Sequence, residues 1–208
     1  MINIAVFASG KGSNFSAIAR ALKKGKIRAR LALLVCDQPQ APVLLKAKRT
    51  PRVKIALVER KDFPSKEDFE SRIIRHLKEN NIDLIVMAGY MRILSLKFTR
   101  QYRRRILNIH PALLPAFKGS HGIRDAFSYG VKVTGVTVHF VDEEMDHGPI
   151  ILQEAVEIKG KDTRESLERR THAVEHKLYP EAIRLYAEGR LKVQGRRVRV
   201  SSRKALSR

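Results

Sequence analysis

The stretch "INIAVFASGKGSN", residues 2–14, predicts how the chain begins to fold. Residues 2–8 are mostly apolar and form a run of the right length for a buried strand, and the glycines that follow permit a tight turn. Asn14 is placed to cap a helix that ends at Gly25. A strand, a glycine turn and a helix in this order are typical of the first unit of a parallel α/β sheet.

The same alternation of strand and helix patterns continues over about the first 140 residues. We expect strands at residues 2–8, 30–36, 54–58, 83–87, 106–109 and 134–141, with helices between them. Pro42 suits the first turn of one helix, and Ser65 with Asp68 resembles a capping box ahead of another. The pattern therefore predicts an α/β protein with a mostly parallel, Rossmann-like sheet and helices on both faces.

The C-terminal part adds a strand, a long helix and a hairpin. A strand is expected at 150–158, and Asp162 or Thr163 then opens a long helix in which Pro180 should cause a kink or a restart. Residues 190–200 alternate around a Gln-Gly turn and predict a terminal hairpin. We expect one domain over 1–189, with halves of about 1–100 and 101–189, then the hairpin at 190–200 and a basic tail at 201–208.

The charge of the chain is strongly positive. It has 42 Lys and Arg against 21 Asp and Glu, a formal net charge of +21. Such a field attracts nucleic acid, or small phosphorylated and polycarboxylate substrates, although solvated surface charge is the more ordinary explanation. The basic tail leaves nucleic-acid binding open. The absence of Trp argues against a base-stacking platform, because such platforms depend on aromatic side chains.

Cysteine content and hydropathy limit the class of protein. A single cysteine, Cys36, excludes a disulfide framework and a multi-cysteine zinc site. Met1 leads directly into the first apolar run, so we expect no cleavable leader, and no apolar run reaches the length of about eighteen residues that a membrane helix needs. The sequence therefore predicts a cytoplasmic protein without membrane contact.

The glycine turn after the first strand is a candidate anion site. Backbone N–H groups at the start of a helix attract phosphate, which would place one phosphate at Gly12, Ser13 and Asn14. A dinucleotide-binding fingerprint is the rival interpretation, with Asp37 as the ribose-binding acid. Phe15 stands where that fingerprint has its third glycine, which argues against nicotinamide binding. A glycine turn without a ligand is a further alternative.

A second motif is "LNIHP", residues 107–111. Asn108 and His110 are two apart on a strand, so they share a face at the carboxyl end, where open α/β sheets bind ligands. An amide donor stabilises an oxyanion while a neighbouring imidazole moves protons, the pair required for acyl transfer through a tetrahedral intermediate. Asp146, in a later loop, could bond to His110 and favour its charged form. A hydrogen-bonded core histidine is the plainer alternative.

Six segments in fixed order carry a family resemblance. They are "GKGSN" (10–14), "AGYMRILS" (88–95), "LNIHPALLPAFKG" (107–119), "TGVTVHFV" (134–141), "MDHGPIILQ" (145–153) and "EHKLYPEAI" (175–183). Through them the chain, up to about residue 200, resembles the folate-dependent glycinamide ribonucleotide formyltransferases of purine synthesis. The resemblance implies that the amine of glycinamide ribonucleotide attacks the formyl carbon of 10-formyltetrahydrofolate, with no metal ion.

The resemblance also implies roles for individual residues. It assigns oxyanion stabilisation to Asn108, proton donation to His110, and to Asp146 the support of the protonated histidine. Substrate binding would fall to Gly12, Ser13, Asn14 and Glu175. The folate site would be lined by Lys66, Met91, Arg92, Ile93, Leu94, Asn108, Val141 and Asp142, the last two through a loop whose backbone holds the pterin.

Several alternatives remain at this point. Methionyl-tRNA formyltransferase has a further C-terminal domain and formyltetrahydrofolate deformylase an N-terminal one, and we expect neither because of where this chain starts and stops. A zinc-peptidase pattern, H-x-x-E-H, occurs at residues 172–176, but no further acidic ligand follows it. His121 and His139 have no assigned orientation. His147 stands where the family often has a small residue. For the oligomeric state, we expect a monomer or homodimer.

Overall fold

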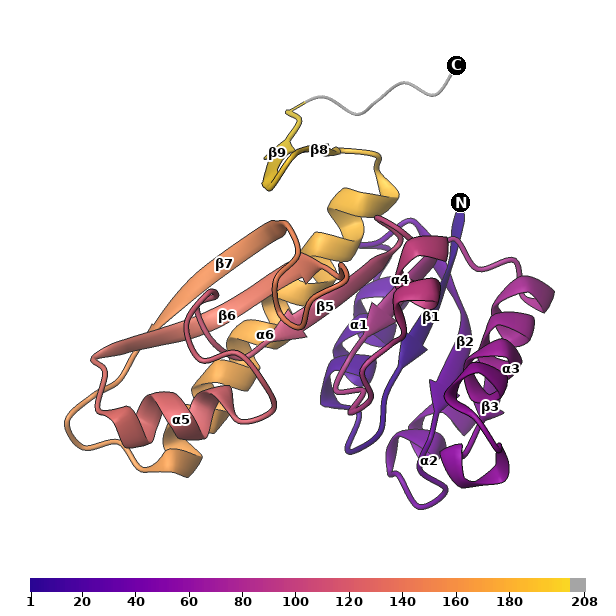
Figure 1. The fold of residues 1–208 in the computed structure, drawn as a ribbon. Helices are drawn as coiled ribbons and strands as arrows, with labels where there is room; N and C mark the ends of the chain where they lie inside the picture. Colours follow the sequence, from indigo (N-terminus) through magenta and orange to yellow (C-terminus); the bar gives the residue numbers. More distant parts are fainter. Residues whose placement is uncertain (203–208) are drawn as a thin grey trace. The chain divides into compact units, whose positions relative to one another are not determined.

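The computed structural model describes residues 1–202 and divides them into two compact units, Met1–Leu107 and the part from Asn108 onward (Figure 1). Most of the predicted basic tail, residues 203–208, lies outside the described residues. All seven strands predicted ahead of the hairpin are present, and each lies within one residue of its expected bounds at either end. The α/β class and the mostly parallel sheet are confirmed.

The first unit is built on four parallel strands in the order β3-β2-β1-β4. These strands are β1 (Ile2–Phe7), β2 (Ala29–Cys36), β3 (Lys54–Leu57) and β4 (Leu84–Met87). The helices are α1 (Ser13–Lys23), α2 (Val43–Lys48), the 3-10 turn η1 (Arg60–Asp62), α3 (Lys66–Glu79) and α4 (Leu96–Gln101). Because parallel crossovers are right-handed and the chain reverses direction across the sheet after β3, α1 and α2 cover one face and α3 the other.

Of the two helix caps predicted in this unit, at Ser65 and Asn14, the first is correct and the second is wrong. Ser65 caps α3, since its hydroxyl accepts a 3.0 Å hydrogen bond from the Asp68 N–H. Asn14, however, lies inside α1, and the N-cap is Gly12. Gly12 has a φ of 67°, and a Cβ there would lie 2.5 Å from Cγ2 of Val43. Only glycine therefore fits at this cap, and its backbone conformation sets the start of the helix.

The second unit contains the end of β5 (Ile106–His110) and a mixed sheet. Its other strands are β6 (Val133–Phe140), β7 (Ile150–Glu157), β8 (Leu191–Gln194) and β9 (Arg197–Val200), and its helices are α5 (Gly122–Tyr129) and α6 (Arg164–Ala187). β6 and β7 are antiparallel, β9 pairs in parallel with β7 at a single position, and β8 and β9 form the expected hairpin. Helix α6 packs against β6, β7 and α5.

Helix α6 begins as predicted but does not restart where it was expected to. Thr163 is its N-cap and forms a reciprocal capping box with Ser166. The sequence predicted a kink or a restart at Pro180, and the restart is excluded because Pro180 lies inside one continuous helix. Tyr179, directly before the proline, and Ala182, two residues after it, are fully buried. We attribute the continuity to this packing, which outweighs the loss of one backbone hydrogen bond.

Candidate active site

The second unit brings Asn108, His110 and Asp146 together. Asn108 and His110 lie at the carboxyl end of β5, and Asp146 lies in the loop between β6 and β7. Oδ1 of Asp146 is 3.4 Å from Nδ2 of Asn108, and Oδ2 is 3.4 Å from Nδ1 of His110. One carboxylate therefore contacts both polar residues of the strand, which the sequence placed on a common face.

Asp146 is held in this position by its backbone and by a third partner. Its φ is 49°, in the left-handed region, which Asp adopts more readily than most residues. The N–H of Gly119 donates a 2.8 Å hydrogen bond to Oδ2. The loop that follows β5 thus reaches the same carboxylate as the end of β5 itself.

His139 is a fourth member of the cluster, and the sequence could not place it. It lies on β6 and is 1% exposed. Its Nε2 is 3.2 Å from Nδ2 of Asn108, and its Nδ1 is 2.8 Å from the carbonyl oxygen of Phe140. The available signal was its sequence position, two residues after Thr137, another buried polar residue on the same side of the strand.

The acceptors around the two histidines define where their protons lie. A carbonyl oxygen only accepts, so Nδ1 of His139 carries a proton and Nε2 accepts from Asn108. Nε2 of His110 is 2.7 Å from the carbonyl of Phe117 and carries a proton for the same reason. The other nitrogen of His110 faces Asp146. An imidazolium at His110 would therefore find an acceptor at each nitrogen.

The charge of Asp146 is stabilised by its neighbours. Burial by itself would raise the pKa of the carboxyl group, but the neighbouring His139 ring, the hydrogen bond from the Gly119 N–H and the charge of His110 lower the pKa below its ordinary value. These partners favour the carboxylate more strongly than burial disfavours it. Asp146 is therefore an anion at neutral pH, and its negative charge would stabilise a protonated His110.

A buried hydroxyl fixes the loop that follows His110. Oγ of Thr137 donates a 2.7 Å hydrogen bond to the carbonyl of Ala112 and accepts one of 3.1 Å from the Leu114 N–H. Gln153 donates from Nε2 to Oγ of Thr137 and to the carbonyl of Leu114, at 2.9 and 3.0 Å. The backbone beyond β5 is thus held by side chains of β6 and β7.

The predicted phosphate site lies in the first unit. Gly12, Ser13 and Asn14 form the start of α1, and Asn14 is 7% exposed. Lys46, from α2, places its ammonium nitrogen 3.4 Å from the carbonyl oxygen of Gly12. The sequence did not predict this cation, because α2 approaches the turn only in the folded unit.

The predicted folate segment 91–94, also in the first unit, combines exposed apolar side chains with a buried ion pair. Met91 and Ile93 are 69% and 68% exposed, whereas Leu94 is buried. Nε of Arg92 is 2.5 Å from Oδ2 of Asp37, whose side chain is 2% exposed. Asp37, considered above as a ribose-binding acid, thus positions the segment instead.

Two further contacts anchor the same segment. Oγ of Ser9 donates to Oδ1 of Asp37 at 2.5 Å and accepts from the Met91 N–H at 3.1 Å. At the other end, buried Glu70 accepts a 2.7 Å hydrogen bond from the Ser95 N–H and a second one from the Ser95 hydroxyl. Two buried carboxylates therefore hold the two ends of residues 91–95.

The remaining predicted residues have simpler surroundings. Glu175 is buried on α6, 3.0 Å from Nδ1 of His172. The rings of His172 and His176 are stacked, as expected for one helix face. Lys66 is the first residue of α3. Val141 and Asp142 begin the loop that carries Asp146, and Asp142 accepts hydrogen bonds within that loop.

Among residues 1–202, no group of three or more His, Cys, Asp or Glu side chains is placed to hold a metal ion. In the part of the chain that the structure describes, no helix combines the length and the apolar character needed to cross a membrane.

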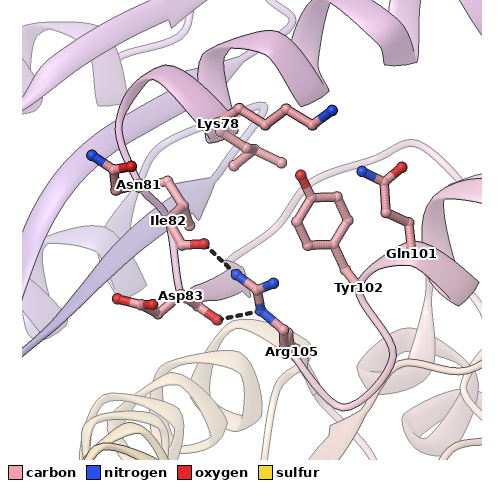
Figure 2. Close-up of a pocket in the computed structure, with 8 residues that line it drawn as sticks. Lys78, Asn81, Ile82, Asp83, Gln101, Tyr102 and Arg105 are labelled. Atoms are coloured by element: carbon pink, nitrogen blue, oxygen red, sulfur yellow. Dashed lines mark hydrogen bonds between the residues drawn. The ribbon is translucent and has the colours of Figure 1, made fainter.

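A cavity of about 480 Å³ in the first unit shares no residue with the predicted sites. It lies where α3 and α4 end, and Figure 2 shows Lys78, Gln101 and Tyr102 around it. The guanidinium of Arg105 is turned to the carbonyl oxygens of Ile82 and Asp83. Since those bonds tie Arg105 to the protein backbone, its main role here is structural.

Comparison with known proteins agrees with this geometry. Residues 2–183 match the family model described as formyl transferase. A phosphoribosylglycinamide formyltransferase of Bacillus subtilis is 49% identical over 88% of this chain and 94% of its own length. The crystal structure of glycinamide ribonucleotide transformylase 1 from Symbiobacterium toebii superposes with a TM-score of 0.94, at 45% identity, over 97% of this chain and 95% of that one.

A deformylase is also similar, but less so. The crystal structure of a formyltetrahydrofolate deformylase from Pseudomonas syringae has a TM-score of 0.86 and 26% identity, and the match covers 97% of this chain and 66% of that one. The fold is shared by proteins with both names, whereas the higher identity belongs to the transformylases.

Proposed function

The chain belongs to the formyl transferase family, and we propose that Asn108, His110 and Asp146 carry out its reaction, the transfer of a formyl group from 10-formyltetrahydrofolate to the amine of glycinamide ribonucleotide in purine biosynthesis. The observation that carries the assignment of residues is the single buried carboxylate of Asp146, which contacts both Asn108 and His110. An amide, an imidazole and a carboxylate in mutual contact supply the groups that acyl transfer requires.

The reaction needs no nucleophile from the protein. The substrate amine forms a bond to the formyl carbon, and the formyl oxygen becomes an oxyanion that Nδ2 of Asn108 stabilises. The Nδ2 hydrogens point to His139 and Asp146, so the oxyanion would replace one of these partners. Because the donor is already oriented, its reorganisation during the reaction is small.

Collapse of the intermediate breaks the bond between the formyl carbon and the folate nitrogen. That nitrogen leaves with a proton, which we assign to His110, while the amine loses a proton as it becomes an amide. The exchange is proton-neutral overall, so His110 is restored when the proton released by the amine returns to it through solvent. Asp146 stabilises the imidazolium state of His110 before the transfer, because the two groups then have opposite charges.

The remaining predicted residues would bind the two substrates. Gly12, Ser13 and Asn14 would bind the phosphate of the nucleotide through the start of α1, and Glu175 its amine and ribose. The folate would contact the residues predicted above from the family resemblance: Lys66, Met91, Arg92, Ile93, Leu94, Asn108, Val141 and Asp142. The exposed apolar side chains of Met91 and Ile93 support this assignment, since a pterin offers them a flat apolar surface.

Location and assembly form part of the same proposal. The only thiol, Cys36, is buried in β2 and burial raises its pKa, which is in keeping with a structural cysteine in a reducing compartment. We therefore place the protein in the cytoplasm, acting on small-molecule substrates as a monomer or homodimer.

The deciding experiment follows release of tetrahydrofolate from 10-formyltetrahydrofolate with and without glycinamide ribonucleotide. Release by the wild type should depend on the nucleotide. It should fall by ~100- to 1,000-fold in Asn108→Ala and by ~100- to 10,000-fold in His110→Ala. Release without the nucleotide would indicate a deformylase instead. Wild-type-like rates in both variants would remove the assigned roles.

A further inference from the structure

The terminal hairpin contacts the loop that carries Asp146, and one side chain makes the contact. Arg196, in the turn between β8 and β9, places Nη1 2.7 Å from Nε2 of His147 and Nη2 2.7 Å from the carbonyl oxygen of the same residue. The guanidinium therefore forms hydrogen bonds with both the ring and the backbone of His147. Two parallel hydrogen bonds from one planar group fix orientation as well as distance.

His147 in turn forms a hydrogen bond with Asp142. Its Nδ1 is 2.8 Å from Oδ2 of Asp142, whose Oδ1 accepts a 3.1 Å hydrogen bond from the Glu144 N–H. Arg196 can only donate, so Nε2 of His147 accepts and Nδ1 carries the proton that goes to Asp142. Arginine, histidine and aspartate thus form one continuous chain of hydrogen bonds across the loop.

The hairpin that presents Arg196 is itself anchored. Arg197, the next residue, is paired with Ile150 at the start of β7. At the open end of the hairpin, Ser201 and Arg190 exchange hydrogen bonds of 2.8 and 2.7 Å. Gly195 has a φ of 56°, which the tight turn requires. The position of Arg196 is therefore set by backbone pairing and not by its side chain alone.

The two ends of the loop lie close together where it leaves the sheet. The N–H of Phe140 donates to the carbonyl of Pro149 at 2.9 Å, and a Cβ added to Gly148 would lie 1.9 Å from the carbonyl oxygen of Phe140. Between these closely spaced ends, the loop has further contacts through Asp142 and Arg196. Asp146 directly precedes His147 in the chain.

From these contacts we propose that Arg196 is a positioning residue that acts through His147 to hold Asp146 against Asn108 and His110. The proposal rests on the proposed function, because Asp146 is its target. Both Arg196 and His147 lie outside the set of reacting groups. The hairpin would then serve as a strap that completes the catalytic loop.

The kinetic test compares Arg196→Met with Arg199→Met, a matched control that removes an exposed arginine from the same hairpin. A shift of about 1 Å in a catalytic group costs up to ~100-fold in rate. For a partial release of the loop we expect kcat to fall about tenfold in Arg196→Met, a factor within that range. It should stay unchanged in Arg199→Met, while KM for the nucleotide remains the same in both. Arg196→Lys, which keeps the charge but has one donor nitrogen in place of the two that contact His147, should recover part of the loss.

A double-mutant comparison isolates the route through His147. If Arg196 acts only through this residue, the double variant Arg196→Met with His147→Gly should be no slower than the slower single variant. Multiplying effects, or equal rates in Arg196→Met and Arg199→Met, would overturn the proposal.

Amide hydrogen exchange supplies a readout that needs no substrate. Exchange at the Glu144 and Gly119 amides, which donate to Asp142 and Asp146, should rise in Arg196→Met and not in Arg199→Met. Faster exchange with an unchanged kcat would reduce the strap to a structural link and refute the catalytic positioning. A wild type that lacks formyl transfer would refute the proposed function, while the exchange data would still report on the strap.

Discussion

Nδ1 of His110 lies 3.4 Å from Oδ2 of Asp146, and their side chains are only 4% and 9% exposed. A carboxylate so poorly solvated needs its hydrogen-bond donors, which here are the Gly119 N–H and the Asn108 amide besides His110 itself. The relationship joins the end of β5 to a loop more than thirty residues later. Stability and the proposed catalysis therefore depend on the same group.

Replacement of Asp146 by Asn should remove a pH-dependent contribution to stability. The pKa of Asp146 is lowered in the folded protein, so its contribution is present above the unfolded pKa of about 3.9 and is lost as the pH falls through the folded value. The free energy of unfolding, measured by urea titration, should differ most between wild type and Asp146→Asn near pH 7. The difference should shrink at pH 3. A difference that is constant with pH would contradict this account.

His139→Leu should lower kcat without weakening nucleotide binding. The substitution leaves an Asn108 N–H without its acceptor and frees the amide to rotate. Losing a buried partner costs about 1–3 kcal/mol, and misplacement of a catalytic donor reduces the rate by up to ~100-fold. Steady-state kinetics should show the loss in kcat. Recovery in His139→Gln, whose amide oxygen can accept from Asn108, would support orientation as the cause.

Asp37→Asn should raise KM for the formyl donor. The Arg92 guanidinium loses a charged partner, and the segment 91–94 loses one of its two anchors. Because Arg92 is about one-third exposed, solvent offsets part of the effect, and we expect an increase of roughly tenfold rather than a complete loss. Titration of initial rates against the folate measures it. An unchanged KM for the folate with a raised KM for the nucleotide would contradict the assignment.

Lys46→Met should raise KM for glycinamide ribonucleotide. The ammonium group lies beside the Gly12 turn, where it would add a positive charge to the proposed phosphate site. We expect an increase of about tenfold, smaller at high salt because ions screen the attraction. Lys48→Met is the matched control, because Lys48 lies exposed on the same helix and its substitution removes the same charge. Equal effects in the two variants would indicate a general charge effect.

Much of the first unit could be predicted because its signals are local. Alternating apolar runs and turn residues located every strand to within one residue. The cap at Ser65 followed from its own side chain and the residue three positions later. The cap at Gly12 was missed, because a glycine cap acts through its φ and its close approach to Val43 rather than through a side-chain donor or acceptor.

The candidate site divides in the same way. Asn108 and His110 were predicted from a two-residue spacing, and Asp146 could be suggested because carboxylates commonly pair with histidine. His139 could not be assigned, because a strand residue faces either a site or the core according to the register of its sheet. The Arg92–Asp37 pair joins residues 55 positions apart, and no local pattern reports such a pairing.

The sequence by itself determined the order of strands and helices, the family, and the asparagine and histidine at the end of β5, because these depend on short-range spacing and backbone preference. Only the tertiary structure decided that Gly119, His139 and Arg196 contact the loop of Asp146. Hydrogen bonds between distant segments form only after the chain has packed, and their geometry depends on sheet register and on the course of two turns. Long-range packing thus converts a recognisable pair of residues into a complete site.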